Sequence, residues 1–201
     1  MAFAATAAHH GSQAPVPLAP LVASTPGPSR TAGGDRLSDR FLVAHLLEHH
    51  HAYARRVLPY VAPLLAKVAG FYGRRYEKLN ALCDAGEELA EALEAHLDEE
   101  ERALFPALLD GTPPREVLRR ALERMHRQHL ELERLLVRVR STADGFAAPI
   151  WAGRSHEVLL EELEALEENV VEHIHLERYL FVSRLFAPAR GIPHSASSHA
   201  A

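Results

Sequence analysis

The stretch "EAHLDEEERALF", residues 94–105, decides how the fold of this chain is interpreted. It lies in a run whose apolar residues return every three or four positions, which is the spacing of an amphipathic α-helix. Two positions on the inward face carry polar side chains, because His96 and Glu100 stand one helical turn apart where Leu or Ala is expected. Unpaired polar groups are costly on a buried face. The stretch therefore indicates either a metal site or a solvent-exposed helix.

The overall composition is that of one helical domain. The chain has 201 residues, of which 47% are hydrophobic, enough for one domain with a core. Leu, Ala, Glu and Arg dominate its interior, and these residues favour helices. The net charge of -5 comes from both signs mixed along the chain, so no nucleic-acid partner is expected. No run is long and apolar enough to span a bilayer, and no membrane partner is expected.

The single cysteine limits the kinds of site that the chain can form. Cys83 alone excludes an intramolecular disulfide framework and a metal cage built from cysteines. A chain with one cysteine fits a reducing compartment, so we expect a cytoplasmic protein. Any metal site must then use imidazole and carboxylate ligands.

Helix-breaking residues divide the chain into four long periodic segments between two tails. We expect helices over Ser38 to Gly70, Glu77 to Leu109, Thr112 to Arg140, and Trp151 to Leu185. In "DGTPP", Thr112 suits an N-cap and Pro113 a first helical position. Short connections favour antiparallel neighbours, which predicts an all-α, up-down-up-down four-helix bundle over residues 38–187. The Ala/Pro/Ser-rich residues 1–37 and the residues 188–201 are expected to be disordered.

Every expected helix places a histidine on its inward face, and two add a glutamate one turn later. The six inward polar residues are His51, His96, Glu100, His129, His173 and Glu177. On the second helix this face continues to Ala103. The first helix has two candidate faces, one through Leu47, His51 and Ala54, the other through Val43, Leu46 and His50, and His126 competes with His129. His45, His49 and His50 are expected to be partly exposed, and Glu99 and Glu101 to form a solvated acidic face.

The number and type of these residues indicate two metal ions. Imidazole and carboxylate ligands without thiolates suit iron, manganese or zinc. A tetrahedral zinc site needs four ligands, whereas here six are expected to converge, two of them carboxylates able to bridge. Each ion would receive two imidazoles and a share of both Glu100 and Glu177. One position would stay open for a diatomic ligand.

Four segments resemble a known family. The segments "HHHAYARRVLP", "AHLDEEERALFPAL", "MHRQHLELERLL" and "EHIHLERYLF" resemble hemerythrin-like proteins with the HHE cation-binding domain, and among them the di-iron iron-sulfur cluster repair proteins of the RIC type. The resemblance covers roughly Phe41 to Phe186. It implies that His51, His96, His129 and His173 are the imidazole ligands of two iron ions, and that Glu100 and Glu177 bridge them.

The details of these segments favour the repair branch over oxygen carriers. Oxygen-carrying hemerythrins have an H-x-x-x-H pair on the third helix, where this chain has His126 and His129, and a longer spacing than that from His173 to Glu177. The resemblance then implies binding of O2 or NO and a role in iron-sulfur cluster repair under nitrosative or oxidative stress, with damaged iron-sulfur proteins as partners. Tyr72 stands where the repair family has a further histidine; about 31 Å from His51 along a continuous helix, it is expected to pack at the bundle end.

Two other functions remain open at the level of sequence. Repair proteins often carry an amino-terminal module with adjacent cysteines, and the first 37 residues contain none. This favours a di-iron module that senses gas or stores iron without repairing anything. The third hypothesis is a metal-free helical interaction bundle. No acid or base for a turnover reaction can be assigned from the sequence, and the oligomeric state cannot be read from it.

Overall fold

The computed structural model describes residues 32–110 and 114–185, without the side chains of 32–38, 110, 115 and 180–185. Most of the two expected tails, residues 1–31 and 188–201, lies outside these ranges. The division of the chain into a bundle with two disordered tails therefore stays a prediction. Residues 32–37, which we expected to belong to the first tail, are helical.

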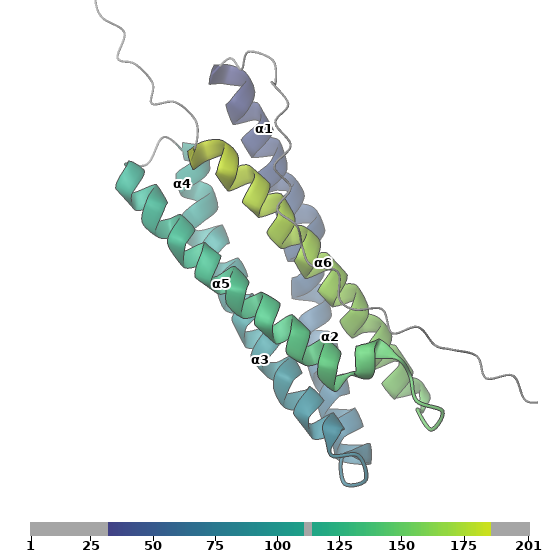
Figure 1. The fold of residues 1–201 in the computed structure, drawn as a ribbon. Helices are drawn as coiled ribbons and strands as arrows, with labels where there is room; N and C mark the ends of the chain where they lie inside the picture. Colours follow the sequence, from purple (N-terminus) through teal and green to yellow (C-terminus); the bar gives the residue numbers. More distant parts are fainter. Residues whose placement is uncertain (1–31, 111–113, 186–201) are drawn as a thin grey trace, which may run out of the picture. The chain divides into compact units, whose positions relative to one another are not determined.

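The described residues form helices and connecting turns, arranged as four rods (Figure 1). The first rod runs through α1 (Ala32–His45), η1 (Leu46–His51) and α2 (Ala52–Tyr72), and the second through α3 (Lys78–Glu99), η2 (Glu100–Leu104) and α4 (Phe105–Asp110). The third rod is α5 (Arg115–Thr142), and the fourth, α6 (Arg154–Leu185), follows a short 3₁₀ turn, η3 (Asp144–Phe146). α3 packs against α2 and α5, and α6 packs against the same two helices. The predicted all-α four-helix bundle is confirmed.

The ends of the third and fourth rods differ slightly from the prediction. α5 begins at Arg115 rather than at Thr112, with Pro114 as its N-cap at ψ 136°. Pro114 has extended backbone geometry, so the helix begins after it, and residues 111–113 lie outside the described ranges. α6 begins at Arg154 rather than at Trp151, because the turns after η3 extend further than expected.

Two hydrophobic clusters form the core. The larger cluster fills the half of the bundle between α2, α3, α5 and α6, from Ala54 and Leu97 down to Phe146. The smaller cluster joins α1, η1, η2, α4 and the first half of α5; it consists of Val43, Leu46, Leu104, Phe105, Leu108, Leu122 and Met125. On each rod, the expected inward polar residues lie in sequence at or next to the border between the two clusters. The bundle therefore holds a buried polar layer with apolar packing on both sides.

Two π-helical turns interrupt the first two rods at this layer. In η1, the Ala52 N–H donates to the Leu47 carbonyl five residues earlier. In η2, the Phe105 N–H donates to the Glu100 carbonyl with the same separation. A π-turn adds one residue to a helical turn and is frequent at functional sites. Each turn therefore shifts the inward face of its rod by one residue.

This shift explains where the predicted inward faces were wrong. On the first rod the buried face runs through Val43 and Leu46 where the π-turn begins and through His51 and Ala54 where it ends, and His50 is buried within the turn beside His51. Both candidate faces were thus correct over part of the rod, whereas Leu47 is exposed. On the second rod the core continues from Glu100 to Leu104, and Ala103, expected inside, is exposed.

The first rod continues without a break to the far end of the bundle. α2 contains Pro59 and Pro63, both on its exposed face, and still extends to Tyr72. Tyr72 packs against the larger cluster there, as expected. Gly73 follows, and a Cβ atom at this position would lie 2.2 Å from Oδ1 of Asn80. The missing side chain allows the tight connection to α3, in which Asn80 Nδ2 donates to the Gly73 carbonyl.

Among the helices in the described ranges, none is long and apolar enough to cross a membrane.

Cys83 gives a first prediction, about thiol reactivity. Burial, a hydrogen bond to Glu87 and the charge of that carboxylate raise the pKa of the Cys83 thiol to about 11. The reactive thiolate is therefore scarce at neutral pH. We expect iodoacetamide to label the folded protein far more slowly at pH 8 than it labels the denatured chain, and Glu87→Gln to accelerate labelling. Equal rates for folded and denatured protein would contradict this protonation state.

Candidate metal centre

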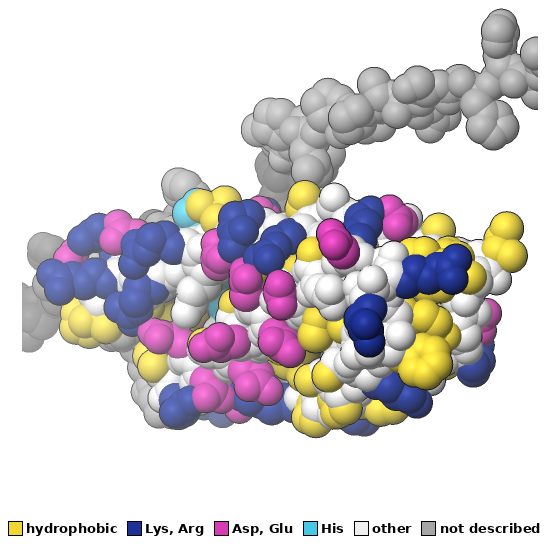
Figure 2. Space-filling view, turned by 90° about the horizontal axis from the view of Figure 1, so that it is seen from below, with side chains coloured by type: hydrophobic (Ala, Val, Ile, Leu, Met, Phe, Trp, Pro, Cys, Tyr) yellow, Lys and Arg dark blue, Asp and Glu magenta, His cyan; other side chains and the backbone are white. Residues whose placement is uncertain are grey.

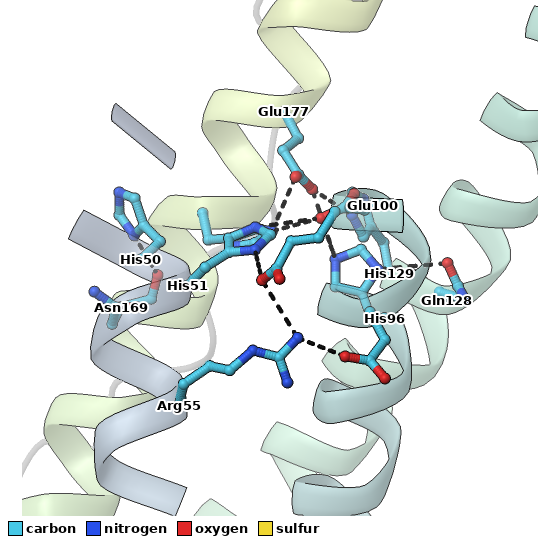
Figure 3. Close-up of polar contacts among 12 residues, drawn as sticks. His50, His51, Arg55, His96, Glu100, Gln128, His129, Asn169 and Glu177 are labelled. Carbon is cyan, nitrogen blue, oxygen red and sulfur yellow. Dashed lines mark hydrogen bonds and ion pairs between the residues drawn. The ribbon is translucent and has the colours of Figure 1, made fainter. Parts of the chain in front are cut away.

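All six expected inward residues converge in the polar layer. Their ligand atoms form two groups, each lying within 4.8 Å: His51, Glu100, His173 and Glu177 in one, and His96, Glu100, His129 and Glu177 in the other. The two carboxylates belong to both groups. None of the six side chains is more than 3% exposed. Four rods thus contribute side chains to one small buried volume (Figure 3).

Glu100 lies at the meeting point of three imidazoles. Its Oε2 is 3.5 Å from the Nε2 atoms of His51, His96 and His173 alike. These separations are too long for good hydrogen bonds, for which about 2.9 Å is typical. Space therefore remains between the carboxylate and the nitrogens that face it.

Glu177 makes the closer contacts. Its Oε2 accepts a hydrogen bond of 2.9 Å from His129 Nε2, and its Oε1 lies 3.0 Å from His173 Nε2. His96 Nε2 is 3.7 Å from the same Oε2. Each carboxylate therefore reaches histidines of both groups, which is the arrangement that a bridging ligand requires.

The polar atoms of this layer have few hydrogen-bond partners. The buried atoms without one include Nε2 of His51, His96 and His173, both carboxylate oxygens of Glu100, and Oε1 of Glu177. Buried polar groups in proteins are nearly always satisfied, so such a concentration requires an explanation. Metal cations would satisfy both the nitrogens and the oxygens at once. The donor set therefore fits two cations that share the carboxylates.

The buried charges of the layer shift the pKa values of His173 and Glu177 in opposite directions. Burial alone would lower the pKa of His173, but the charges and close approach of Glu177 and Glu100 raise it to about 10. For Glu177, burial acts in the opposite direction, and the charge of His173 with the imidazole hydrogen bonds keeps its pKa well below the usual range. Protons therefore occupy the site when cations do not.

A chain of polar contacts orients His51. Its Nδ1–H donates to Glu101 Oε1 over 2.9 Å, and Arg55 lies 3.3 Å from the same oxygen. Arg55 also donates to Asp98 Oδ1 over 2.6 Å (Figure 3). Such contacts fix the tautomer of a ligating histidine, because they leave Nε2 free for the metal. Glu101, which we expected to be ordinary solvated charge, is therefore part of the support of the site.

His96 has a similar support on the third rod. Its Nδ1–H donates to Oε1 of Gln128 over 3.4 Å. Gln128 directly precedes His129 in the chain. The sequence analysis missed Gln128. Its position one residue from an inward histidine on the same helix was the available signal.

The observed burial of His50 differs from the expected partial exposure. It is buried rather than partly exposed, since only 3% of its surface is accessible. Its ring stands 5.9 Å from that of His173, and Nδ1 interacts with the Asn169 carbonyl at 3.3 Å. His50 thus lies beside the two groups but belongs to neither of them. The sequence signal was present, because His50 continued the rival face through Val43 and Leu46.

Two further histidines near the expected ligands lie outside the cluster. His126 is exposed on α5, so the structure brings His129 rather than His126 to the carboxylates. His175 is also exposed on α6.

The family model described as the hemerythrin HHE cation binding domain matches residues 42–185, which include all six side chains of the polar layer. The chain belongs to this family.

Several curated proteins are similar to this chain at low sequence identity. The iron-sulfur cluster repair protein DnrN of Neisseria gonorrhoeae is 28% identical over 145 residues, which cover 71% of this chain and 88% of that protein. The repair protein ScdA of Staphylococcus haemolyticus strain JCSC1435 is 22% identical, over 71% of this chain and 65% of its own length. The repair protein YtfE of Edwardsiella ictaluri strain 93-146 is 25% identical, over 71% and 64% respectively. The chain thus spans a little under two thirds of the latter two.

The charge state of His173 predicts proton release on metal binding. At pH 7.5 an imidazole with a pKa of about 10 is protonated, and a metal can bind it only after the proton leaves. Metal affinity should therefore rise with pH up to about 10. We expect calorimetric titration of the metal-free protein with Fe²⁺ to give different heats in buffers of different ionisation enthalpy, corresponding to roughly one released proton or more per chain. Heats that do not depend on the buffer would contradict this charge state.

Proposed function

We propose that this chain binds two iron ions in the polar layer, binds O2 or NO there, and takes part in the repair of damaged iron-sulfur proteins during nitrosative or oxidative stress. The observation that carries the proposal is the sharing of Glu100 and Glu177 by two groups of four ligand atoms. One cation would use His51 and His173, and the other His96 and His129. Manganese and zinc are the alternatives to iron for such a donor set.

The surroundings of the site favour a small uncharged ligand. A cavity of about 90 Å³ lies between the second rod and α5, with Glu100 and Gln128 in its wall and Leu104, Ala121 and Met125 among its apolar lining residues. A small, largely apolar cavity of this size suits a diatomic molecule better than a sugar. When bound, iron would supply a redox-active centre with a free position for such a molecule.

The protein's own side chains would orient the ligands and keep water out. Glu101 and Gln128 accept hydrogen bonds from His51 and His96 and so keep both Nε2 atoms turned inward. The two hydrophobic clusters cover the polar layer from both sides along the bundle. A site enclosed in this way strengthens the electrostatic interactions within it.

The repair role is supported by the relatives, whose names describe iron-sulfur cluster repair. Damaged iron-sulfur proteins would then be the partners, and the cytoplasm the place of action. No turnover reaction is assigned to the chain.

A second function is favoured by the cysteine content. Cys83 is the single cysteine among 201 residues, and its thiol is held in the protonated form. The chain therefore offers little thiolate to exchange with a cluster, which favours a di-iron module that senses gas or stores iron. The unpaired polar atoms of the layer argue against the third hypothesis, a metal-free interaction bundle, because they would carry an uncompensated cost.

Metal content tests the ligand assignment. We expect about two irons per chain in the wild type, roughly one in His129→Leu because His129 belongs to one group, and fewer still in Glu100→Ala because both groups share Glu100. His126→Leu is the matched control, since this exposed histidine lies on the same helix. Iron would be measured by atomic emission on protein from iron-replete cells. The same loss in His126→Leu and His129→Leu would refute the assignment.

Repair and sensing are separated by a recovery assay. The iron-loaded protein is added to a [4Fe-4S] dehydratase inactivated by nitric oxide, and its absorption spectrum is followed during exposure to the gas. Repair requires recovery of dehydratase activity that Glu100→Ala abolishes. Sensing predicts a gas-dependent spectrum without recovery. A metal-free bundle predicts that His173→Leu keeps or raises the melting temperature and changes neither metal content nor spectrum.

A further inference from the structure

A second cavity lies at the end of the bundle opposite the small hydrophobic cluster. Its volume is about 320 Å³, within the range of small-molecule sites. It is formed by the start of α3, the end of α5 with η3, and the start of α6. His156 in its wall precedes His173 on α6 by nearly five turns, roughly 25 Å at 1.5 Å per residue. The cavity is therefore separate from the metal centre.

His156 is an unexplained buried polar group in this wall. Only 3% of its surface is accessible, and its Nδ1 has no hydrogen-bond partner. Burial lowers the pKa of His156, so the ring is neutral at physiological pH and offers one donor and one acceptor. An unsatisfied group of this kind is costly, unless a bound molecule completes its hydrogen bonds. The expected inward face began at Leu159, so the sequence analysis missed His156 three residues earlier.

Aromatic rings provide a second recognition element. Tyr76 and Trp151 stack with their ring centres 3.7 Å apart and their planes inclined by 2°. The Trp151 ring also lies 5.4 Å from His156, and 39% of the Trp151 surface is exposed. Leu79, Ala143 and Leu160 continue the wall with apolar surface. The cavity thus combines a flat aromatic surface, an aliphatic wall and one neutral hydrogen-bonding ring.

The charges at the rim do not favour a ligand of either sign. Lys78 and Asp144 form an ion pair that joins the start of α3 to η3. Glu77 and Arg75 lie nearby with opposite charges, and the Arg75 guanidinium stands 5.6 Å from the Tyr76 ring centre. Figure 2 views the molecule from the side on which these connections lie, and shows hydrophobic side chains gathered among Lys and Arg over the right half of that face. An uncharged molecule suits such a rim best.

We propose that this cavity is a binding site for an uncharged, planar aromatic molecule of one or two fused rings that carries a hydrogen-bonding nitrogen or oxygen. Its ring packs against Trp151 and the aliphatic wall, and its polar atom pairs with the His156 imidazole. The site is independent of the iron centre, because no residue is shared between the two.

The test uses benzimidazole as the probe and the iron-loaded full chain. Trp151 is the only tryptophan of the protein, so its fluorescence reports directly on this cavity. We expect benzimidazole to change the Trp151 emission saturably, with calorimetry giving the same affinity. Indene, which has a similar shape but no hydrogen-bonding atom, should bind roughly tenfold more weakly, as should benzimidazole to His156→Leu.

Controls separate binding from folding and from the metal centre. Ala147→Phe, which places a ring at an exposed position of the cavity wall, should abolish binding while iron content and helical circular dichroism stay unchanged. His126→Leu, remote from the cavity, should bind like the wild type. Absence of a saturable response in the wild type would overturn the proposal, as would equal affinity for indene and benzimidazole. If His156→Leu does not fold, Ala147→Phe and the indene comparison decide.

Discussion

The electrostatic requirement of two buried carboxylates shapes the rest of this bundle. Glu100 and Glu177 lie in a buried layer, where an ionised group is stable only with positive charge beside it. Four imidazoles, one from each rod, surround them. Protons can supply the charge at neutral pH, as the raised pKa of His173 indicates, and cations can supply more of it. The hydrophobic clusters on both sides shield these protons or cations from solvent.

The two π-turns bring the ligand positions of the first two rods into the polar layer. A regular helix returns a residue to the same face after three or four positions, which suits α5 and α6. The first two rods must satisfy an apolar face on α1 and α4 as well as the ligand positions, and the two faces are out of phase by one residue. The additional residue in η1 and η2 allows both. His50 and His51 are consequently buried next to each other.

His129, His173 and Glu177 could be predicted as inward residues because their helices have a regular period. The order of the four helices could be predicted from the helix-breaking residues between them. The position of His51 could not be derived from period alone, because a π-turn leaves no distinct mark in composition, and the same reason led to the error at Ala103. Glu101 was missed for another reason. A half-exposed carboxylate resembles surface charge until the partner helix, with His51 and Arg55, is in place.

The polar layer joins two parts of the bundle that are packed by separate hydrophobic clusters. Among the described side chains, seven buried residues form the cluster of α1, η1, η2, α4 and the first half of α5, and the larger cluster fills the other half of the bundle. Because all four rods contribute side chains to the polar layer, bound cations would join η1 and η2 to α5 and α6 there. Cation binding would then stabilise the contacts that α1 and α4, which adjoin these turns in the chain, make with the rest of the bundle.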